Sequence, residues 1–253
     1  MNLFDLKGKI AIVTGCSRLN GLGYGMAEGL AEAGANIVGV ARSDMSEVKR
    51  KIELLGQEFF PINADLMYKE NIYPIIDKTM KKFGKIDILI NNAGIIRRNK
   101  VRDFSEKDWD EVLDVNLKNI FFFSQAVGKQ FIKQETGGKI INVASMLAYQ
   151  GGIRVPSYTA SKHGVAGLTK ALCNEWAKYQ INVNSIAPGY MATDNTAPLR
   201  EDEERNKAIL ERIPADRWGE NEDLKGIAIF LSSSASDYMN GAVVPVDGGW
   251  LAR

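Results

Sequence analysis

Short runs of consecutive apolar residues alternate with helical patterns along almost the whole chain of 253 residues. A strand with one wet face alternates apolar and polar residues, whereas these runs are apolar at every position. Continuous apolar strands are typical of a parallel sheet that helices cover on both faces, because both faces are then buried. The sequence therefore predicts an α/β fold, a doubly wound parallel sheet flanked by helices (a Rossmann fold), with residues 1–253 as a single domain.

The runs predict seven strands and the helices between them. We expect the strands at residues 10–13, 37–41, 59–64, 86–90, 139–143, 181–187 and 242–246. We expect the helices at residues 21–34, 45–55, 69–83, 105–134, 158–179 and 221–232. Ser105 and Asp108 form a capping pattern at the start of the fourth helix, and Asn221 is expected to cap the last one. Residues 195–215 are charged and predict a short helix on a mobile excursion from the sheet.

The composition excludes several classes of function. The net charge of +1 gives no global field for nucleic acid or for an acidic membrane. One histidine and two cysteines rule out a histidine zinc cluster, an iron–sulfur site and a disulfide framework, so no metal is expected. No apolar stretch is long enough for a signal peptide or a membrane span, so a cytoplasmic location is expected.

A glycine-rich loop follows the first strand and leads into the first helix. It contains Gly15, Gly21 and Gly23, and five residues separate the first two of these. In a strand–turn–helix unit, such glycines let the backbone approach a pyrophosphate, which the helix N-terminus then binds through free N–H groups. The loop therefore predicts dinucleotide binding, with phosphate contacts shifted by the unusual spacing.

The end of the second strand bears on the choice of cofactor. A carboxylate there would bind the ribose hydroxyls of NAD, but the strand is followed by Arg42. Arg42, helped by Arg18, suits the 2′-phosphate of NADP, although both could be solvated surface charges. We therefore expect NADP or NAD, with a lean towards NADP. Asp65, after the third strand, is placed to accept from an adenine amino group or to serve as a turn residue.

Tyr158 and Lys162 carry the strongest motif. Residues four apart stack on one helix face, and a nearby ammonium together with a cofactor cation favours the tyrosinate. The Ser145 hydroxyl follows the fifth strand and can polarise a carbonyl in the same crevice. Asn116 interrupts a predicted helix, where it indicates either a local irregularity with a bound water or an ordinary solvated position.

These motifs resemble the short-chain dehydrogenase/reductase family over nearly the whole chain. The resemblance implies a catalytic set of Ser145, Tyr158, Lys162 and Asn116, in which the tyrosine is the general acid/base and the serine orients the carbonyl. It implies that Lys162 holds the nicotinamide ribose, that Asn116 positions a relay water and that Thr193 binds the carboxamide. The expected cofactor contacts are Gly15, Ser17, Arg18, Gly21, Leu22, Gly23, Arg42, Asp65, Leu66, Asn92, Ala93, Gly94, Tyr158, Lys162, Pro188, Gly189, Met191 and Thr193.

A closer resemblance lies in residues 145–162, 186–196, 212–219 and the last eight residues. These segments are similar to those of the 2-dehydro-3-deoxy-D-gluconate 5-dehydrogenases of uronate and pectin breakdown, which implies a sugar-acid substrate. A sugar acid needs a cation for its carboxylate, and Arg154 and Arg98 are candidates, although Arg154 could instead form a salt bridge between subunits. The expected substrate contacts are Ser145, Met146, Gln150, Arg154, Tyr158, Arg98 and Tyr190.

Other functions stay open at this point. Gluconate 5-dehydrogenase and 3-oxoacyl-carrier-protein reductase share the same chemistry. A catalytically silent NAD(P)-binding regulator is a different class, which the intact Ser145, Tyr158 and Lys162 disfavour. The family resemblance implies a homotetramer, and no nucleic acid or membrane partner is expected.

Overall fold

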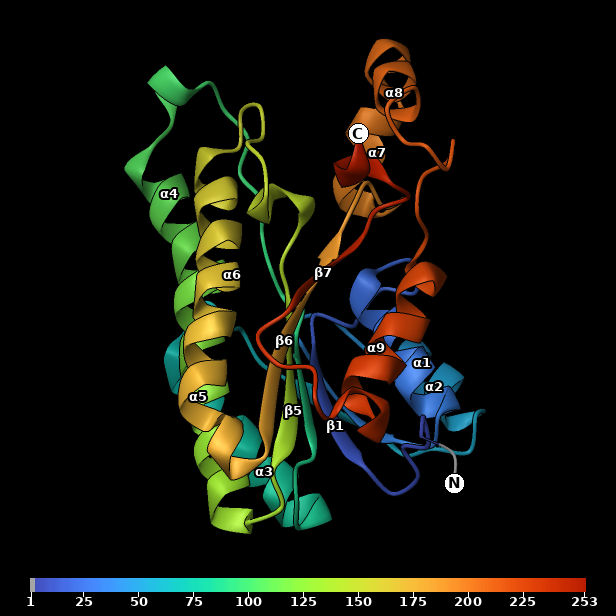
Figure 1. The fold of residues 1–253 in the computed structure, drawn as a ribbon, viewed down its shortest axis with the longest axis vertical. Helices are drawn as coiled ribbons and strands as arrows, with labels where there is room; N and C mark the ends of the chain where they lie inside the picture. Colours follow the sequence, from blue (N-terminus) through green and yellow to red (C-terminus); the bar gives the residue numbers. More distant parts are fainter. Residues whose placement is uncertain (1–2) are drawn as a thin grey trace.

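Seven parallel strands form one sheet in the order β3-β2-β1-β4-β5-β6-β7 in the computed structural model, which describes residues 3–253. The strands are β1 (Ile10–Thr14), β2 (Asn36–Ala41), β3 (Phe59–Asn63), β4 (Ile88–Asn91), β5 (Gly138–Val143), β6 (Ile181–Pro188) and β7 (Val243–Val246). Each lies within two residues of its predicted bounds. The doubly wound α/β fold is confirmed (Figure 1).

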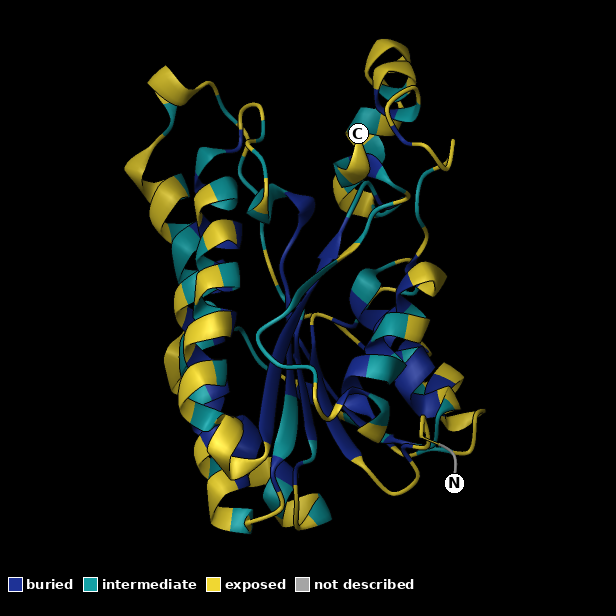
Figure 2. Cartoon of the chain, in the orientation of Figure 1, coloured by how far each residue is buried: buried dark blue, intermediate teal, exposed yellow. Residues whose placement is uncertain are grey.

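Helices cover both faces of this sheet (Figure 1). On one face lie α1 (Leu22–Glu32), α2 (Ser46–Glu53) and α9 (Lys225–Ser232). On the other lie α3 (Ile72–Phe83), α4 (Glu106–Leu113), α5 (Asn119–Gln134) and α6 (Pro156–Trp176). Neighbouring strand residues point to opposite faces of the sheet, and each face has its own apolar core. Val13 packs in the core beneath α1 and α9, which we call the first core, and Ile12 packs in the core beneath α3 and α5. Both residues are fully buried. Both sides of a strand must therefore be apolar, which explains the continuous runs (Figure 2).

Short helical turns complete the chain. They are η1 (Lys69–Asn71), η2 (Val101–Asp103), η4 (Met146–Ala148), η5 (Ala177–Tyr179), η6 (Asp194–Thr196), η7 (Asn221–Leu224), η8 (Ser234–Ser236) and η9 (Trp250–Ala252). No helix within residues 3–253 is long and apolar enough to cross a membrane.

Local residue chemistry sets several helix ends. Ser105 caps α4 as predicted, because its hydroxyl accepts from Asp108 N at 3.1 Å. Helix α3 ends at Gly84, which adopts a left-handed φ of 74°. Helix α6 begins two residues before its predicted start because Pro156 suits the first helical turn.

The predicted helix over residues 105–134 is not one regular helix. A π-helical turn at Asp114–Lys118, labelled η3, separates α4 from α5. Asn116 lies in this turn and is fully buried, so the alternative of an ordinary solvated position is wrong and the predicted irregularity is confirmed. Such turns are frequent at functional sites.

Residues 193–218, which we call the outer segment, extend away from the sheet (Figure 1). They hold η6, α7 (Ala197–Arg200) and α8 (Glu203–Leu210). Most of the segment is exposed (Figure 2), but Ile209 and Ile213 pack with Met146 and Trp250 in a small apolar cluster of their own. The charged excursion with a short helix is thus present, with two short helices in place of one.

Candidate active site

The carboxyl ends of the parallel strands meet at one edge of the sheet, and most of the predicted site residues lie there. Thr14 ends β1, Asn91 ends β4, and Pro188 ends β6. The glycine-rich loop, the turn after β4 and the outer segment all begin at this edge. In open parallel sheets this crevice is where ligands bind.

Ser145, Tyr158 and Lys162 come together at this edge. Ser145 follows β5 and is 9% exposed, and Tyr158 lies one helical turn before Lys162 on α6. Lys162 Nζ lies 5.4 Å from the centroid of the Tyr158 ring. It also donates to Val143 O at 2.6 Å, which ties α6 to the end of β5. The spacing read from the sequence therefore produces the expected cluster.

Burial is the largest influence on the electrostatics of this cluster. Burial raises the pKa of Tyr158, and the hydrogen bond from Ser145 and the charge of Arg98 only partly oppose this effect. Burial also lowers the pKa of Lys162 to about 8, because the buried ammonium loses its hydration. The expected effect of Lys162 and a cofactor cation on Tyr158 concerns the complex with the dinucleotide, and it stays a prediction.

Asn116 lies beside the turn that follows β4. Its Oδ1 accepts from Ile95 N and its Nδ2 donates to Ile95 O, both at 2.8 Å. Nδ2 also lies 3.4 Å from Ser161 Oγ on α6. The π-helical turn thus lets one amide side chain connect the helix to the loop after β4 and to the helix of Tyr158.

The glycine-rich loop packs closely against the turn after β4. A Cβ on Gly23 would lie 2.4 Å from Gly15 O and 2.5 Å from Asn92 Nδ2. A Cβ on Gly15 would lie 2.9 Å from Ala93 Cα, and Gly15 also has a left-handed φ of 69°. These glycines are therefore required by the contact of the chain with itself, as well as by any ligand. Gly94 is similarly close, at 3.2 Å from Asn116 Oδ1.

The N-terminus of α1 fits the phosphates of a dinucleotide. Gly21 is its N-cap, so no side chain caps the helix, and the first turn carries no acidic residue. Leu22 and Gly23 begin the helix with their N–H groups at the positive end of its dipole. Ser17 and Arg18 lie on the loop just before it, where they can add a hydroxyl and a cation.

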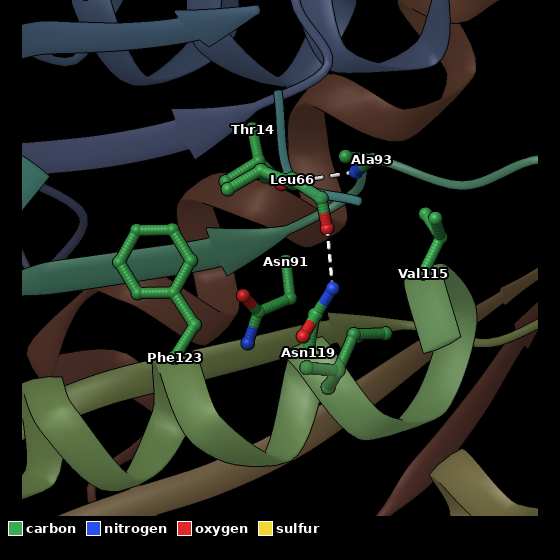
Figure 3. Close-up of a pocket in the computed structure, with 8 residues that line it drawn as sticks. Thr14, Leu66, Asn91, Ala93, Val115, Asn119 and Phe123 are labelled. Atoms are coloured by element: carbon green, nitrogen blue, oxygen red, sulfur yellow. Dashed lines mark hydrogen bonds between the residues drawn. The ribbon is translucent and has the colours of Figure 1, made fainter. Parts of the chain in front are cut away.

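Two polar residues that the sequence analysis did not single out connect the strand ends (Figure 3). Thr14 Oγ1 accepts from Asn92 N and Ala93 N, both at 2.9 Å. Asn119 Nδ2 donates to Leu66 O, which ties α5 to the loop after β3. Asn119 comes three residues after Asn116, and a second asparagine in a predicted helix was the signal that could have identified it.

Arg42 and Asp65 face each other across the ends of β2 and β3. Arg42 Nη1 lies 3.7 Å from Asp65 Oδ2, and the Arg42 side chain is 66% exposed. Asp65 Oδ1 also accepts from Met67 N at 2.9 Å, which holds the turn. Both predicted cofactor residues are therefore available at the rim of the crevice.

The extended glycine-rich loop reaches the outer segment. Asn20 Nδ2 donates to Asp194 Oδ1 at 2.6 Å, and Arg18 Nη1 lies 3.8 Å from Asp194 Oδ2. Asn221 Nδ2 donates to Leu19 O at 2.7 Å. The expectation that Asn221 caps the last helix is wrong, because Glu220 caps η7 and frees Asn221 to hold the loop.

The predicted cofactor residues that follow β6 differ in their packing. Gly189 N donates to Val246 O at 3.0 Å, and a Cβ on Gly189 would lie 2.6 Å from Asp247 Cα. The Met191 side chain is 4% exposed and packs in the first core. Thr193 lies further out and caps η6.

Four of the predicted substrate residues contact the outer segment or the C-terminal turn. Arg98 Nη2 donates to Asn195 O at 3.1 Å. Gln150 Oε1 accepts from Trp250 Nε1 at 3.2 Å, and Tyr190 packs edge-on against Trp250 at 4.7 Å between ring centroids. Met146 is buried beneath them in the cluster that includes Trp250.

Arg154 stands apart from the other predicted substrate residues. It is exposed, it has a left-handed φ of 64°, and its backbone oxygen accepts from Asn99 N at 3.0 Å. Within residues 3–253 its side chain forms no ion pair, so a partner in another subunit stays a prediction.

Comparisons with known proteins agree with this geometry. The family model described as "Enoyl-(Acyl carrier protein) reductase" matches residues 15–251. A 2-dehydro-3-deoxy-D-gluconate 5-dehydrogenase from Dickeya dadantii is 58% identical over 253 residues, which cover 100% of this chain and 99% of the relative. The enzyme of the same name from Escherichia coli is 57% identical with the same coverage. A gluconate 5-dehydrogenase from Burkholderia cenocepacia, solved with NADP and tartrate, is 38% identical at a TM-score of 0.94, covering 100% of this chain and 98% of that one.

The family model spans nearly the whole chain, and both curated relatives share more than half of its residues. The resemblance expected from the glycine-rich loop and from Ser145, Tyr158 and Lys162 is therefore confirmed. The chain belongs to the short-chain dehydrogenase/reductase family and is an NAD(P)-dependent oxidoreductase that acts on CH–OH groups.

Proposed function

We propose that residues 1–253 form a single NAD(P)-binding catalytic domain that interconverts a secondary alcohol and a ketone on a sugar acid. The best-supported substrate is 2-dehydro-3-deoxy-D-gluconate, oxidised at C5. The relatives from Dickeya dadantii and Escherichia coli, at 58% and 57% identity, carry that name. The observation that supports the chemistry most strongly is the cluster of Ser145, Tyr158 and Lys162 at the carboxyl edge of the sheet.

Proton transfer is assigned to Tyr158. In the oxidation, Tyr158 Oη takes the proton of the substrate hydroxyl, and Ser145 Oγ donates a hydrogen bond to the same oxygen as negative charge develops there. The bound nicotinamide supplies the hydride acceptor, and its positive charge favours the tyrosinate. This charge matters because burial alone raises the pKa of Tyr158.

Lys162 and Asn116 support Tyr158 from the same side. Lys162 Nζ, already held by Val143 O, is placed to donate to the nicotinamide ribose. Asn116 holds the loop after β4 against α6, and we propose that it positions the water that returns the proton to solvent. Both roles follow the family pattern, and the buried hydrogen bonds of both residues are consistent with them.

Cofactor contacts are assigned to the loops at the carboxyl edge. The N-terminus of α1 would hold the phosphates, and Asp65 and Leu66 would contact the adenine. Asn92–Gly94 would line the nicotinamide side, together with Pro188, Gly189, Met191 and Thr193. Arg42 and Arg18 favour NADP over NAD, because both guanidinium groups are largely exposed at the crevice rim.

The substrate site is assigned to the side of the crevice below the outer segment. Arg98 is assigned to the reacting end of the substrate, because its charge lowers the pKa of Tyr158 and its Nη2 donates to Asn195 O in the outer segment. Met146, Gln150 and Tyr190 line the side that faces Trp250. Arg154 is assigned as a substrate contact at the rim of the crevice.

Gluconate 5-dehydrogenase activity is the second candidate. The Burkholderia cenocepacia relative has that name and was solved with tartrate, a small hydroxy acid. We also propose a cytoplasmic homotetramer, as the family resemblance implies. His163 is exposed on α6, which leaves it available for a contact between subunits.

A panel of sugar acids with NAD and NADP tests this proposal. We expect the highest kcat/KM with 2-dehydro-3-deoxy-D-gluconate, and we expect Tyr158→Phe to lower kcat about 100- to 10,000-fold with unchanged NADPH affinity. Higher efficiency on D-gluconate or on a 3-oxoacyl thioester would favour those alternatives. Cofactor binding without turnover of any carbonyl substrate would favour a silent regulator.

A further inference from the structure

The guanidinium of Arg212 is fixed where the outer segment meets the crevice. Its Cζ lies 4.0 Å from the centroid of the Trp250 ring, and its Nη2 donates to Gln150 Oε1 at 3.3 Å. The same Gln150 oxygen accepts from Trp250 Nε1 at 3.2 Å. One ring and one amide oxygen therefore hold the guanidinium, so less side-chain freedom is lost when a ligand binds.

This cation lacks a counter-ion in the protein. Within residues 3–253, no carboxylate lies within ion-pair distance of Arg212. Among the nearby cations, Lys207 and Arg217 are paired with Glu211 and Asp223. Arg205 also lacks an ion pair within residues 3–253, but no ring or amide holds its guanidinium as Trp250 and Gln150 hold that of Arg212. A guanidinium carries five N–H donors, and stacking uses only its face, so its edge is free for a carboxylate.

Arg212 is linked to the segment that carries Ser145 through its contacts with Gln150 and Trp250. Gln150 lies on the segment that begins at Ser145, and Met146 packs against the same cluster as Trp250. Burial raises the pKa of Tyr190, and the charges of Arg205 and Arg212 lower it, which places both arginines beside this predicted substrate residue.

Arg98 and Arg212 differ in their contacts. Arg98 Nη2 donates to Asn195 O at 3.1 Å, and the charge of Arg98 lowers the pKa of Tyr158, which exchanges the proton at C5. The carboxylate carbon, C1, is four bonds away from C5. A carboxylate at that separation suits a second cation, and Arg212, held by Trp250 and Gln150, is one.

We propose that Arg212, oriented by Gln150 and Trp250, forms the subsite that binds the carboxylate of the sugar acid. This inference rests on the proposed function and deepens it. The subsite binds the planar carboxylate of a short hydroxy acid. Neutral ketones and acyl thioesters bind more weakly, because they have no carboxylate at that position.

Steady-state kinetics with saturating NADP and 2-dehydro-3-deoxy-D-gluconate test the subsite. Arg212→Gln is expected to raise KM about 10- to 100-fold, because a charge-assisted pair of hydrogen bonds is lost, while kcat and NADPH affinity stay within twofold. Arg212→Lys, which keeps the charge without the planar fork, is expected to raise KM by less. The inhibition constant of tartrate, used as a second carboxylate probe, is expected to rise with KM.

Two further variants sharpen the result. Lys207→Gln removes one positive charge from the same segment at a side chain that is 79% exposed, and it is expected to change KM less than twofold. Gln150→Glu places a carboxylate on Arg212 and is expected to raise KM about tenfold through competition with the substrate.

Three outcomes would overturn the inference. If Arg212→Gln leaves KM within twofold of the wild type, the subsite is wrong and the proposed function stands. If the variant loses NADPH affinity in parallel with KM, the residue is structural and not part of a subsite. If the wild-type protein turns over no sugar acid at all, the proposed function itself fails and the subsite fails with it.

Discussion

The cofactor side of the crevice, which ends at Thr193, and the rest of the outer segment are built in opposite ways. On the cofactor side, Gly15 and Gly23 leave no room for a Cβ, and the fully buried strands β1 and β4 carry the loops. The outer segment has two short helices, and only Ile209 and Ile213 within it are buried. Two exposed contacts to Asp194, from Arg18 and Asn20, connect the outer segment directly to the glycine-rich loop.

This difference separates two tasks. Hydride and proton transfer need fixed geometry, and the cofactor side has close packing and a buried hydrogen bond from Lys162 to Val143. Under the proposed assignment, the substrate contacts lie beside the outer segment, which rests on its own small apolar cluster around Trp250. Substitutions on the cofactor side test this separation.

Lys162→Met is expected to abolish turnover and yet to stabilise the protein by about 2 kcal/mol at pH 7. Burial lowers the pKa of Lys162 to about 8 from 10.5, so folding a charged lysine is costly below pH 8. The wild type recovers this free energy as the pH rises from 8 to 10.5, where the unfolded chain binds the proton more tightly. The stability gap measured by denaturant unfolding should therefore shrink across that range, and a constant gap would contradict the buried charge.

Ser145→Ala is expected to lower kcat about 100- to 1,000-fold. The hydroxyl lies beside Tyr158 and is the donor placed to stabilise the developing oxyanion. Single-turnover rates of the reverse reaction, with NADPH and the 5-keto product of the oxidation, measure this effect. NADPH affinity from fluorescence titration serves as the control. A loss of NADPH affinity as large as the loss of rate would mean that the chemistry and the cofactor site are not separable.

Gly23→Ala is expected to weaken NADPH binding about 10- to 100-fold and to destabilise the protein by about 1–3 kcal/mol. The added Cβ would meet Gly15 O at 2.4 Å, so the loop must move. Gly226→Ala is the matched control, because it lies in helix α9 with no atom within 4 Å of the new Cβ. That control is expected to stabilise the protein by about 0.5–1 kcal/mol. Similar thermal shifts for both variants would refute the close-packing argument.

Arg42→Ser is expected to lower the preference for NADP over NAD about tenfold. The guanidinium lies at the rim of the crevice, where it can reach a 2′-phosphate, although Asp65 at 3.7 Å shares it. The ratio of kcat/KM values for the two cofactors measures the effect. An unchanged ratio would assign the discrimination to other residues.

The features that depend on neighbours along the chain were predictable from the sequence. Tyr158 and Lys162 are one helical turn apart, and Ser145 follows a strand, so helix and strand periodicity alone placed them. The burial that raises the pKa of Tyr158 depends on packing from several elements, so no local pattern could indicate it. Asn221 shows the same limit, because its acceptor, Leu19 O, lies 202 positions away in the chain.

The outer segment was the least predictable region for the same reason. Its charged residues indicated exposure, but Arg212 acquires its orientation from Gln150 and Trp250. These three residues come from segments that no local pattern connects. Only the fold brings the end of α8, the turn after Ser145 and the C-terminal turn together.

Ile209→Ala tests the separation of tasks most directly, because Ile209 is 3% exposed and anchors the outer segment without touching the cofactor side. The affinity for NADPH and the KM for the sugar-acid substrate should be measured on the same preparation. We predict that KM rises at least about tenfold while the Kd for NADPH stays within about threefold of the wild type. A Kd that rises as much as KM would contradict the account, since the two regions would then act as one.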